Sequence, residues 1–175
     1  MSGNSPMHAY FAIVSKRDVR KYTSDPIPDD VIERMLQAGR ATGSASNRQP
    51  WRFYVIRNRE MLDRLAEAVY EPDNLKGCQL AIAIVMTQPR SFDAGRAAQN
   101  IGLAAWADGV GTCPNGLRDK PLVRQLLDLE EDWDVPTILS AGYPDQPVPR
   151  RDSTPEELLE RINRKPLDEL THWID

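Results

Sequence analysis

Ser44-Ala45-Ser46-Asn47-Arg48-Gln49-Pro50-Trp51 is the stretch of this 175-residue chain that most constrains its fold. Small and amide residues form a polar loop, which Pro50 ends. Residues 51–56 are rich in aromatic and β-branched side chains and predict a strand. Residues 28–38, before the loop, carry apolar side chains at helical spacing. A polar loop between helix and strand can offer hydroxyls, amides and backbone N–H groups to a ligand, although the same composition also suits a plain turn.

The composition predicts one globular domain, 1–175, in which we expect residues 1–6 to be a loose tail. A hydrophobic fraction of 41% is too high for a disordered chain. The formal net charge of −4 leaves no basic excess to neutralise phosphates, so we expect no nucleic-acid partner. Apolar runs are too short to span a membrane and the N-terminus lacks a secretory pattern, so we expect no membrane association.

Cysteine and histidine usage bears on compartment and metal. Cys78 and Cys113 lie far apart and form no C-x-x-C pair, which favours reduced thiols. His8 and His172 are the only histidines, so the chain offers few ligands for a zinc ion. We therefore expect a cytoplasmic protein without a metal site.

Periodicity along the chain predicts helices and strands without strict βαβ alternation, which favours an α+β fold. The glycine patterns of Rossmann and phosphate-binding loops are absent. The alanine-rich helix 93–108 is expected to be buried. The predicted strands are 51–56, 80–86, 112–113 and 136–141; the helices are 8–14, 28–38, 60–69, 93–108, 121–129 and a short one from 154; and 71–74 and 114–116 are expected to be a loop and a turn.

Residues 16–21 hold four cations, Lys16, Arg17, Arg20 and Lys21. Their alternation with Asp18 and Val19 predicts an extended segment with basic side chains on opposite sides. Such a cluster is ordinarily a solvated face, and it becomes an anion site only where other groups converge on it.

Taken in order, several segments resemble the nitroreductase-like flavoproteins. The loop 44–51 is similar to the serine/asparagine–glutamine–proline–tryptophan motif of that family. Further matches are 16–22, 93–111, 112–116 and 139–144, with a weaker one at 164–167. The resemblance therefore covers nearly the whole chain, and five matches in order are far more specific than any one of them.

The resemblance implies a nitroreductase-like fold, with a mainly antiparallel central sheet flanked by helices, and a homodimer whose sites are shared across the interface. It also implies non-covalent FMN, with NADH or NADPH as electron donor. A small organic acceptor, such as a nitro compound or a quinone, would be reduced in a ping-pong cycle. The flavin N5 atom would carry the chemistry, so no catalytic side chain is expected.

The same resemblance assigns the candidate cofactor-binding residues. Lys16, Arg17 and Asp18 would lie beside the phosphate and ribityl chain, and Arg20 near the pyrimidine edge of the ring. Arg164 and Lys165 would complete the phosphate pocket, a task that suits arginine because its fork binds phosphate in two places. The other candidates are Gly43, Ser44, Ala45 and Asn47, reaching the flavin from the second subunit, Gln49 in the same loop, Asn74, and Pro114, Asn115 and Gly116, over one ring face.

The sequence leaves several alternative interpretations open. Asn115-Gly116 alone also suits a hairpin turn, and Gln49 could anchor its loop rather than touch flavin. Asp18 stands where the family often has serine, and 17–20 resembles relatives that fragment reduced flavin to a benzimidazole. The loop around Asn47 resembles the plain nitroreductases, which makes fragmentation the alternative. A flavin-binding sensor or carrier with little turnover, and an apo structural protein, are the other classes.

Overall fold

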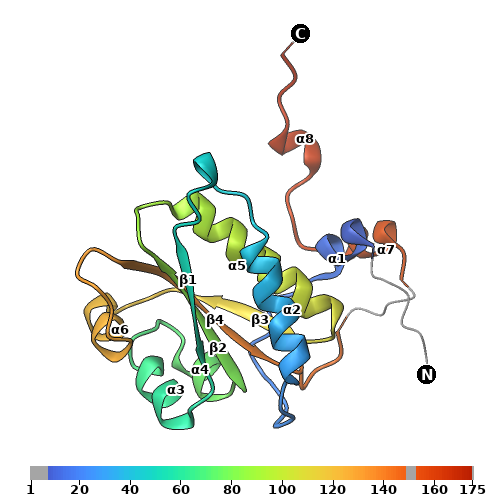
Figure 1. Ribbon diagram of the computed structural model, residues 1–175. Helices are drawn as coiled ribbons and strands as arrows, with labels where there is room; N and C mark the ends of the chain where they lie inside the picture. Colours follow the sequence, from blue (N-terminus) through green and yellow to red (C-terminus); the bar gives the residue numbers. More distant parts are fainter. Residues whose placement is uncertain (1–7, 149–152, 175) are drawn as a thin grey trace.

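A computed structural model of the protein describes residues 8–148 and 153–174 (Figure 1), so the expected tail at 1–6 lies outside the described residues. One antiparallel sheet runs through it in the order β1-β2-β4-β3. The strands are β1 (Trp51–Ile56), β2 (Leu80–Met86), β3 (Gly111–Asn115) and β4 (Asp134–Gly142). Ile82 of β2 lies opposite Val55 and Leu139 of its two neighbours. The expected α+β class and antiparallel sheet are confirmed.

The strand β2 is buried on both faces, as its continuous apolar run predicts. Its even-numbered residues belong to one core cluster and its odd-numbered residues to the other. Helices cover both faces of the sheet (Figure 1). One cluster includes residues of α2 (Asp29–Arg40) and α5 (Ser91–Ala107), and the other includes residues of α3 (Arg59–Ala66), α4 (Pro72–Lys76) and α6 (Lys120–Leu126).

Local signals in the sequence set the helix ends. The Asn58 side chain accepts a hydrogen bond from the Met61 N–H and begins α3, and Asp119 does the same for α6. The helix α7 (Pro155–Arg161) begins with a capping box in which Thr154 and Glu157 bond each other's backbone N–H groups. Helices predicted over 60–69 and 121–129 stop earlier, at Ala66 and Leu126.

Two expectations about local structure are wrong. Residues 71–74 are not a loop, because Pro72 starts α4 and Asn74 is buried within it. Residues 114–116 are not a turn, because β3 continues through Asn115 opposite Ile138. The helix α5 is buried where it faces α2 and the sheet, and its other side is open to solvent in the single chain, so its full burial stays a prediction. The exposed residues of α5 include Phe92, Gly95, Arg96 and Gln99.

The N-terminal part of the chain joins the sheet at its β3 edge. After α1 (Ala9–Ser15), the extended segment 16–22 forms a parallel bridge between Asp18 and Thr112 and an antiparallel one between Tyr22 and Pro144. The predicted extended conformation is confirmed. Beyond α7, which packs on α1, residues 162–174 with the short helix α8 (Leu167–Leu170) stand away from the sheet (Figure 1). Within the described residues, no helix is long and apolar enough to cross a bilayer.

Gly111 is where segment 16–22 and β3 approach most closely, because a Cβ atom there would lie 2.6 Å from Val19 Cβ. We expect Gly111→Ala to displace the segment and lower the free energy of unfolding by about 1–3 kcal/mol in urea denaturation. In a Val19→Gly background the same change should cost less, because the clash is gone. Equal costs in both backgrounds would contradict this packing.

Candidate functional site

Segment 16–20 lies along the edge of β3 and carries the predicted cations. The Val19 N–H donates to the Thr112 carbonyl at 3.1 Å, which fixes the segment on the strand. Lys16 and Asp18, two residues apart in an extended chain, point the same way, and Lys16 Nζ lies 2.7 Å from Asp18 Oδ1. The Lys16 side chain is only 12% exposed, so this ion pair is partly shielded from water.

The helix α5 closes over the same place. A Cβ atom at Gly102 would lie 3.1 Å from both Lys16 Cε and Thr112 Oγ1. The glycine therefore leaves room for the lysine side chain between helix and strand. This contact packs Lys16 against α5, a neighbour that no local pattern predicts.

Arg17 points to the other side of the segment. Its guanidinium donates to the carbonyls of Val14 at 2.8 Å and Lys16 at 2.9 Å. A cavity of about 330 Å³ opens beside it. The cavity is lined by residues 17–21 and 144–148. The segment thus presents an ion pair toward α5 and further cations, Arg17, Arg20 and Lys21, around this cavity.

Beneath β3 the structure holds a buried network of polar side chains. The Asn115 amide nitrogen donates to the carbonyls of Cys113 (3.0 Å) and Ile138 (2.9 Å) and to Ser140 Oγ (3.2 Å). Its amide oxygen accepts from Asn74 Nδ2 at 2.8 Å. The side chains of Asn74 and Asn115 therefore bond to each other inside the protein, where both residues are buried.

Tyr22 joins this network to the basic segment. Its hydroxyl donates to the Val19 carbonyl and shares a 2.9 Å hydrogen bond with Ser140 Oγ. Burial raises the pKa of the Tyr22 phenol, although its hydrogen bond with Ser140 opposes the shift. Burial also raises the pKa of the Cys113 thiol, against the charge of nearby Arg20. Both groups are therefore neutral near pH 7, and Tyr22 acts as a fixed hydrogen-bonding group.

Two small residues at the end of β3 face solvent. Pro114 and Gly116 are exposed, whereas Asn115 between them is buried. The Tyr70 N–H donates to the Gly116 carbonyl at 3.1 Å, and a Cβ atom at Gly116 would lie 3.2 Å from the Tyr70 ring. The strand end therefore offers a narrow shelf without bulky side chains, bordered by an aromatic ring that is itself 68% exposed.

The loop with the glutamine–proline–tryptophan motif holds strained backbone. Three non-glycine residues lie in the left-handed region: Ser46 (φ 53°), Asn47 (φ 51°) and Gln49 (φ 48°). The loop is braced internally, since Ser44 Oγ accepts from the Gln49 N–H at 2.9 Å and Gln49 Nε2 donates to Asn47 Oδ1 at 3.2 Å. Gln49 thus anchors the loop. Left-handed backbone at non-glycine residues is often found in loops that take part in function.

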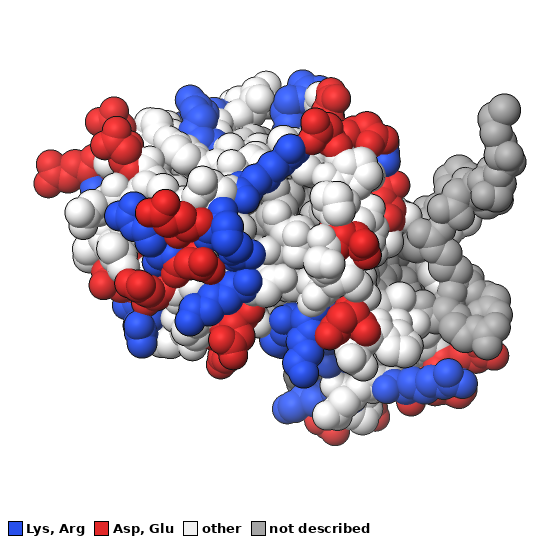
Figure 2. All heavy atoms as spheres, turned by 90° about the horizontal axis from the view of Figure 1, so that it is seen from below, with Lys and Arg blue, Asp and Glu red and all other residues white. Residues whose placement is uncertain are grey.

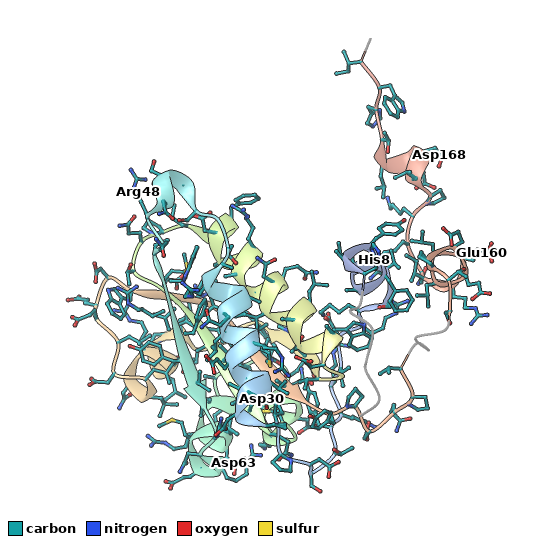
Figure 3. All side chains as sticks on the ribbon, turned by 45° about the vertical axis from the view of Figure 1, so that its right-hand side comes forward. His8, Asp30, Arg48, Asp63, Glu160 and Asp168 are labelled. Atoms are coloured by element: carbon teal, nitrogen blue, oxygen red, sulfur yellow. The ribbon has the colours of Figure 1, made fainter. Side chains whose placement is uncertain are left out.

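The structure brings together only part of the predicted site. Segment 16–20, Asn74 and residues 114–116 converge on β3. The loop 43–49, with η1 (Ala45–Asn47), projects beyond the N-terminal end of α5 (Figure 1). Arg48 points outward from the tip of this loop (Figure 3). Arg164 and Lys165 lie on the C-terminal arm, where Arg164 bonds the carbonyls of its own neighbours. In one chain these two groups do not complete the site.

Sequence reasoning missed several residues of this site. Ser140 is a polar residue within an apolar strand, a signal that a buried polar contact could have explained. Tyr22 and Tyr70 carry no such signal, because their roles depend on segments distant in sequence. The same is true of Phe92 and Arg96, which contact each other, with Arg96 lying beside Gly43.

Comparison with known proteins now identifies the fold. Residues 13–79 and 86–143 match the profile of the Nitroreductase family. The chain belongs to the nitroreductase family. An Archaeoglobus fulgidus protein, named as a candidate NADH dehydrogenase/NAD(P)H nitroreductase, is 36% identical over 146 residues, covering 75% of this chain and 83% of the relative. This nitroreductase-family protein is accordingly an oxidoreductase.

Two further comparisons bear on the cofactor and on the alternative chemistry. A candidate nitroreductase of Desulfovibrio desulfuricans, solved in complex with FMN, superposes with a TM-score of 0.71 at 26% identity, covering 91% of this chain and 98% of that one. A 5,6-dimethylbenzimidazole synthase of Rhodospirillum rubrum is 24% identical over 172 residues, covering 77% of this chain and 82% of the relative.

The surface charge of this nitroreductase-family protein is mixed. On the face seen in Figure 2, acidic and basic side chains are interspersed rather than gathered into one basic field. Among the described residues, no group of three or more histidine, cysteine or acidic side chains is placed to hold a metal ion. Cys78 and Cys113 are both free and buried.

Asn115→Ala should destabilise the protein, because it removes from the interior the hydrogen bonds that the Asn115 amide makes with Asn74, Ser140 and the carbonyls of Cys113 and Ile138. We expect the free energy of unfolding to fall by about 1–3 kcal/mol or more, measured by denaturant titration. Asn163→Ala, at an exposed position, is the matched control and should be near neutral. An unchanged stability for Asn115→Ala would show that the network is not needed for folding.

Proposed function

We propose that this protein is an FMN-dependent NAD(P)H oxidoreductase that reduces nitro compounds, quinones or related small organic acceptors by a ping-pong mechanism. The observation that carries the proposal is the convergence of the cationic segment 16–20 on β3, next to the open shelf of Pro114 and Gly116. FMN is a phosphate joined to a flat ring by a polyol chain. It needs cations near the phosphate and an open surface beside the ring.

The residues present fit FMN. Lys16, Arg17 and Arg20 supply positive charge within one extended segment, and Asp18 is held by Lys16 so that its carboxylate does not face a phosphate unpaired. A side chain at Gly116 would crowd the Tyr70 ring, because a Cβ atom there would lie 3.2 Å from it.

Each group has a defined task in this proposal. When bound, FMN would supply the hydride-transfer chemistry between a nicotinamide nucleotide and the acceptor. Arg17, beside the cavity, would hold the phosphate end, and Lys16 would add positive charge from the other side of the segment. Arg20 would favour negative charge at the pyrimidine edge of the ring. A backbone N–H at Asn115 or Gly116 would donate to the flavin ring. The buried Asn74–Asn115 pair holds that backbone in place.

A second candidate is fragmentation of reduced flavin to a benzimidazole. Asp18 favours it, because its carboxylate is 42% exposed at the site, and the chain is similar to a 5,6-dimethylbenzimidazole synthase. The Lys16–Asp18 ion pair and the loop 44–51 favour the plain reductase, as does the higher identity to the Archaeoglobus fulgidus relative.

The protein should purify yellow, and denaturation should release FMN rather than FAD, since no dinucleotide motif is present. The visible absorbance of the bound flavin should bleach when NADH or NADPH is added without oxygen. It should recover when a quinone or nitro compound follows. Bound FMN that no nucleotide reduces would instead support a sensor or carrier, and a colourless protein would refute the assignment. Release of a benzimidazole would favour fragmentation.

We further propose that the protein is a homodimer with sites shared across the interface. Three features of the single chain support this. The strained loop 43–49 does not meet segment 16–20. The C-terminal arm, which holds Arg164 and Lys165, stands away from the sheet (Figure 1). It leaves large apolar side chains in solvent. These are Leu167 (78% exposed), Leu170 (61%), Trp173 (88%) and Ile174 (94%).

The third feature is the open face of α5. Gly95 has nothing within 4 Å of the position its Cβ atom would take, and it lies on the same helical face as the exposed Gln99 and the half-buried Leu103. A glycine on an exposed helix face costs about 1 kcal/mol relative to alanine. A second α5 packed closely across a two-fold axis would explain a glycine at this position, because a larger side chain would hold the helices apart.

Gly95→Leu should therefore dissociate the dimer, because the added side chain holds the two helices apart. Sedimentation velocity should show a shift toward monomer, with loss of bound flavin because each pocket would be left half complete. Gly95→Ala is the smaller control and should keep more of the dimer. A wild-type protein that sediments as a flavin-loaded monomer would overturn the proposal, as would a Gly95→Leu variant that stays dimeric with full flavin.

A further inference from the structure

Tyr70 lies at the edge of the candidate site, beside the end of β3. Its backbone N–H donates to the Gly116 carbonyl at 3.1 Å. A Cβ atom at Gly116 would lie 3.2 Å from the Tyr70 ring. Among the described residues beyond the glycine's own chain neighbours, only this ring comes within 4 Å of that Cβ position. Since Gly116 is one of the residues proposed to face the flavin, Tyr70 is a direct neighbour of the proposed flavin site.

Hydrogen bonds hold the backbone on which Tyr70 stands. Val69 forms an antiparallel bridge with Leu117, and the Ala68 carbonyl accepts from the Arg118 N–H at 2.8 Å. Ala68 and Val69 are fully buried, whereas Tyr70 is 68% exposed. The backbone therefore presents the tyrosine ring to solvent at a defined point. A tyrosine has only two side-chain torsions to order when a ligand packs against it, so the entropy cost of that contact is low.

Tyr70 is not part of the surfaces proposed for the second copy. It lies between α3 and α4, and both helices pack on the face of the sheet opposite α5. In Figure 1, α3 and α4 lie at the bottom of the molecule, whereas the loop 43–49 and the C-terminal arm lie at its top. One exposed tyrosine is ordinary on a protein surface. This one is informative because it borders the flavin site and the proposed dimer contacts do not explain its exposure.

The proposed reaction brings two flat rings to this place in turn. In a ping-pong cycle the nicotinamide nucleotide leaves before the acceptor binds, and both must come within reach of the same flavin ring. The nicotinamide ring is flat, as are the rings of nitroaromatic compounds and quinones. A flat ring gains binding energy from a neighbouring aromatic side chain beyond the area that it buries. One aromatic side chain beside the flavin can therefore serve donor and acceptor alike.

We propose that Tyr70 is a substrate-contacting residue, whose ring forms a shared wall for the nicotinamide ring of the donor and for the ring of the acceptor. The inference rests on the proposed function and adds to it a residue that determines specificity for flat rings. The ring, held beside Gly116, packs against whichever substrate lies over the flavin. The Tyr70 hydroxyl has no part in this role.

Rapid-mixing kinetics of the two half-reactions test the shared wall. Flavin reduction by NADH or NADPH and flavin reoxidation by menadione are measured with the wild type and with Tyr70→Ala. Both second-order rate constants should fall about two- to tenfold in the variant, the range that one aromatic pair contributes to binding. Reoxidation by ferricyanide, which has no flat ring, should be unchanged.

Matched variants separate contact with the substrates from support of the fold. Tyr70→Phe keeps the ring and should behave as the wild type does. Tyr10→Ala removes another tyrosine, 55% exposed on α1, and should change none of the rates. FMN content and the midpoint of unfolding should be the same in Tyr70→Ala as in the wild type. Loss of FMN, an equal fall with ferricyanide, or a fall with only one of the two ring substrates would overturn the inference.

A binding measurement separates this inference from the proposed function. Benzamide and cyclohexanecarboxamide carry the same amide on a flat and on a puckered ring, and calorimetry of either with the oxidised, flavin-loaded protein needs no electron transfer. The wild type should bind benzamide more tightly, and the ratio of the two affinities should fall about two- to tenfold in Tyr70→Ala but not in Tyr70→Phe.

The outcomes of this measurement are distinct. A protein that binds FMN but is reduced by neither nucleotide refutes the proposed function, and the affinity ratio still decides the role of Tyr70. Equal binding of both amides by the wild type, or a ratio that Tyr70→Ala leaves unchanged, overturns the inference alone. A protein that takes up no FMN overturns both.

Discussion

The buried amide of Asn115 is the contact on which the candidate site depends. It bonds two backbone carbonyls, Ser140 and Asn74 at once, in an interior where an unpaired polar group is costly. Through Ser140 the same network reaches Tyr22, whose hydroxyl holds the Val19 carbonyl. The positions of the basic segment and of the strand end are thus set by one set of hydrogen bonds, and neither can shift without leaving polar groups unpaired.

Small residues allow the backbone elements around this network to approach. Gly111 admits Val19 against β3, and Gly102 admits Lys16 between α5 and the strand. On the other side of α5, Gly39 brings α2 close, since a Cβ atom there would lie 2.9 Å from Ile101 and Phe53. These close contacts let Lys16, Arg17 and Asp18 lie along the edge of β3. The helices and the sheet around them stay closely packed.

The single chain looks incomplete in ways that agree with one another. The arm 162–174 exposes four large apolar side chains, the open face of α5 holds a glycine without neighbours, and the loop 43–49 keeps strained backbone away from segment 16–20. Each feature alone is common on protein surfaces. Together they mark the surfaces that a second copy would cover.

The sequence by itself determined the elements whose signals are local. The continuous apolar run of 80–86 is the central strand, the alternation in 16–22 is an extended segment, and the order of five motifs led to the family. Local signals failed at 71–74 and 114–116. There the proline that suggested a loop starts α4, and the Asn-Gly pair that suggested a turn ends a strand, because Asn74 and Asn115 satisfy each other only when the sheet is assembled.

Only the tertiary structure decided which predicted residues lie together. It joined Lys16 and Asp18 to Thr112 and Gly102, buried the side chains of Asn74 and Asn115, and set the loop 43–49 and Arg164 apart from them. It also showed Tyr22, Ser140 and the Phe92–Arg96 pair. Contacts between residues tens of positions apart depend on how helices and strands pack, and that packing is fixed by the volume and polarity of many side chains at once rather than by any local motif.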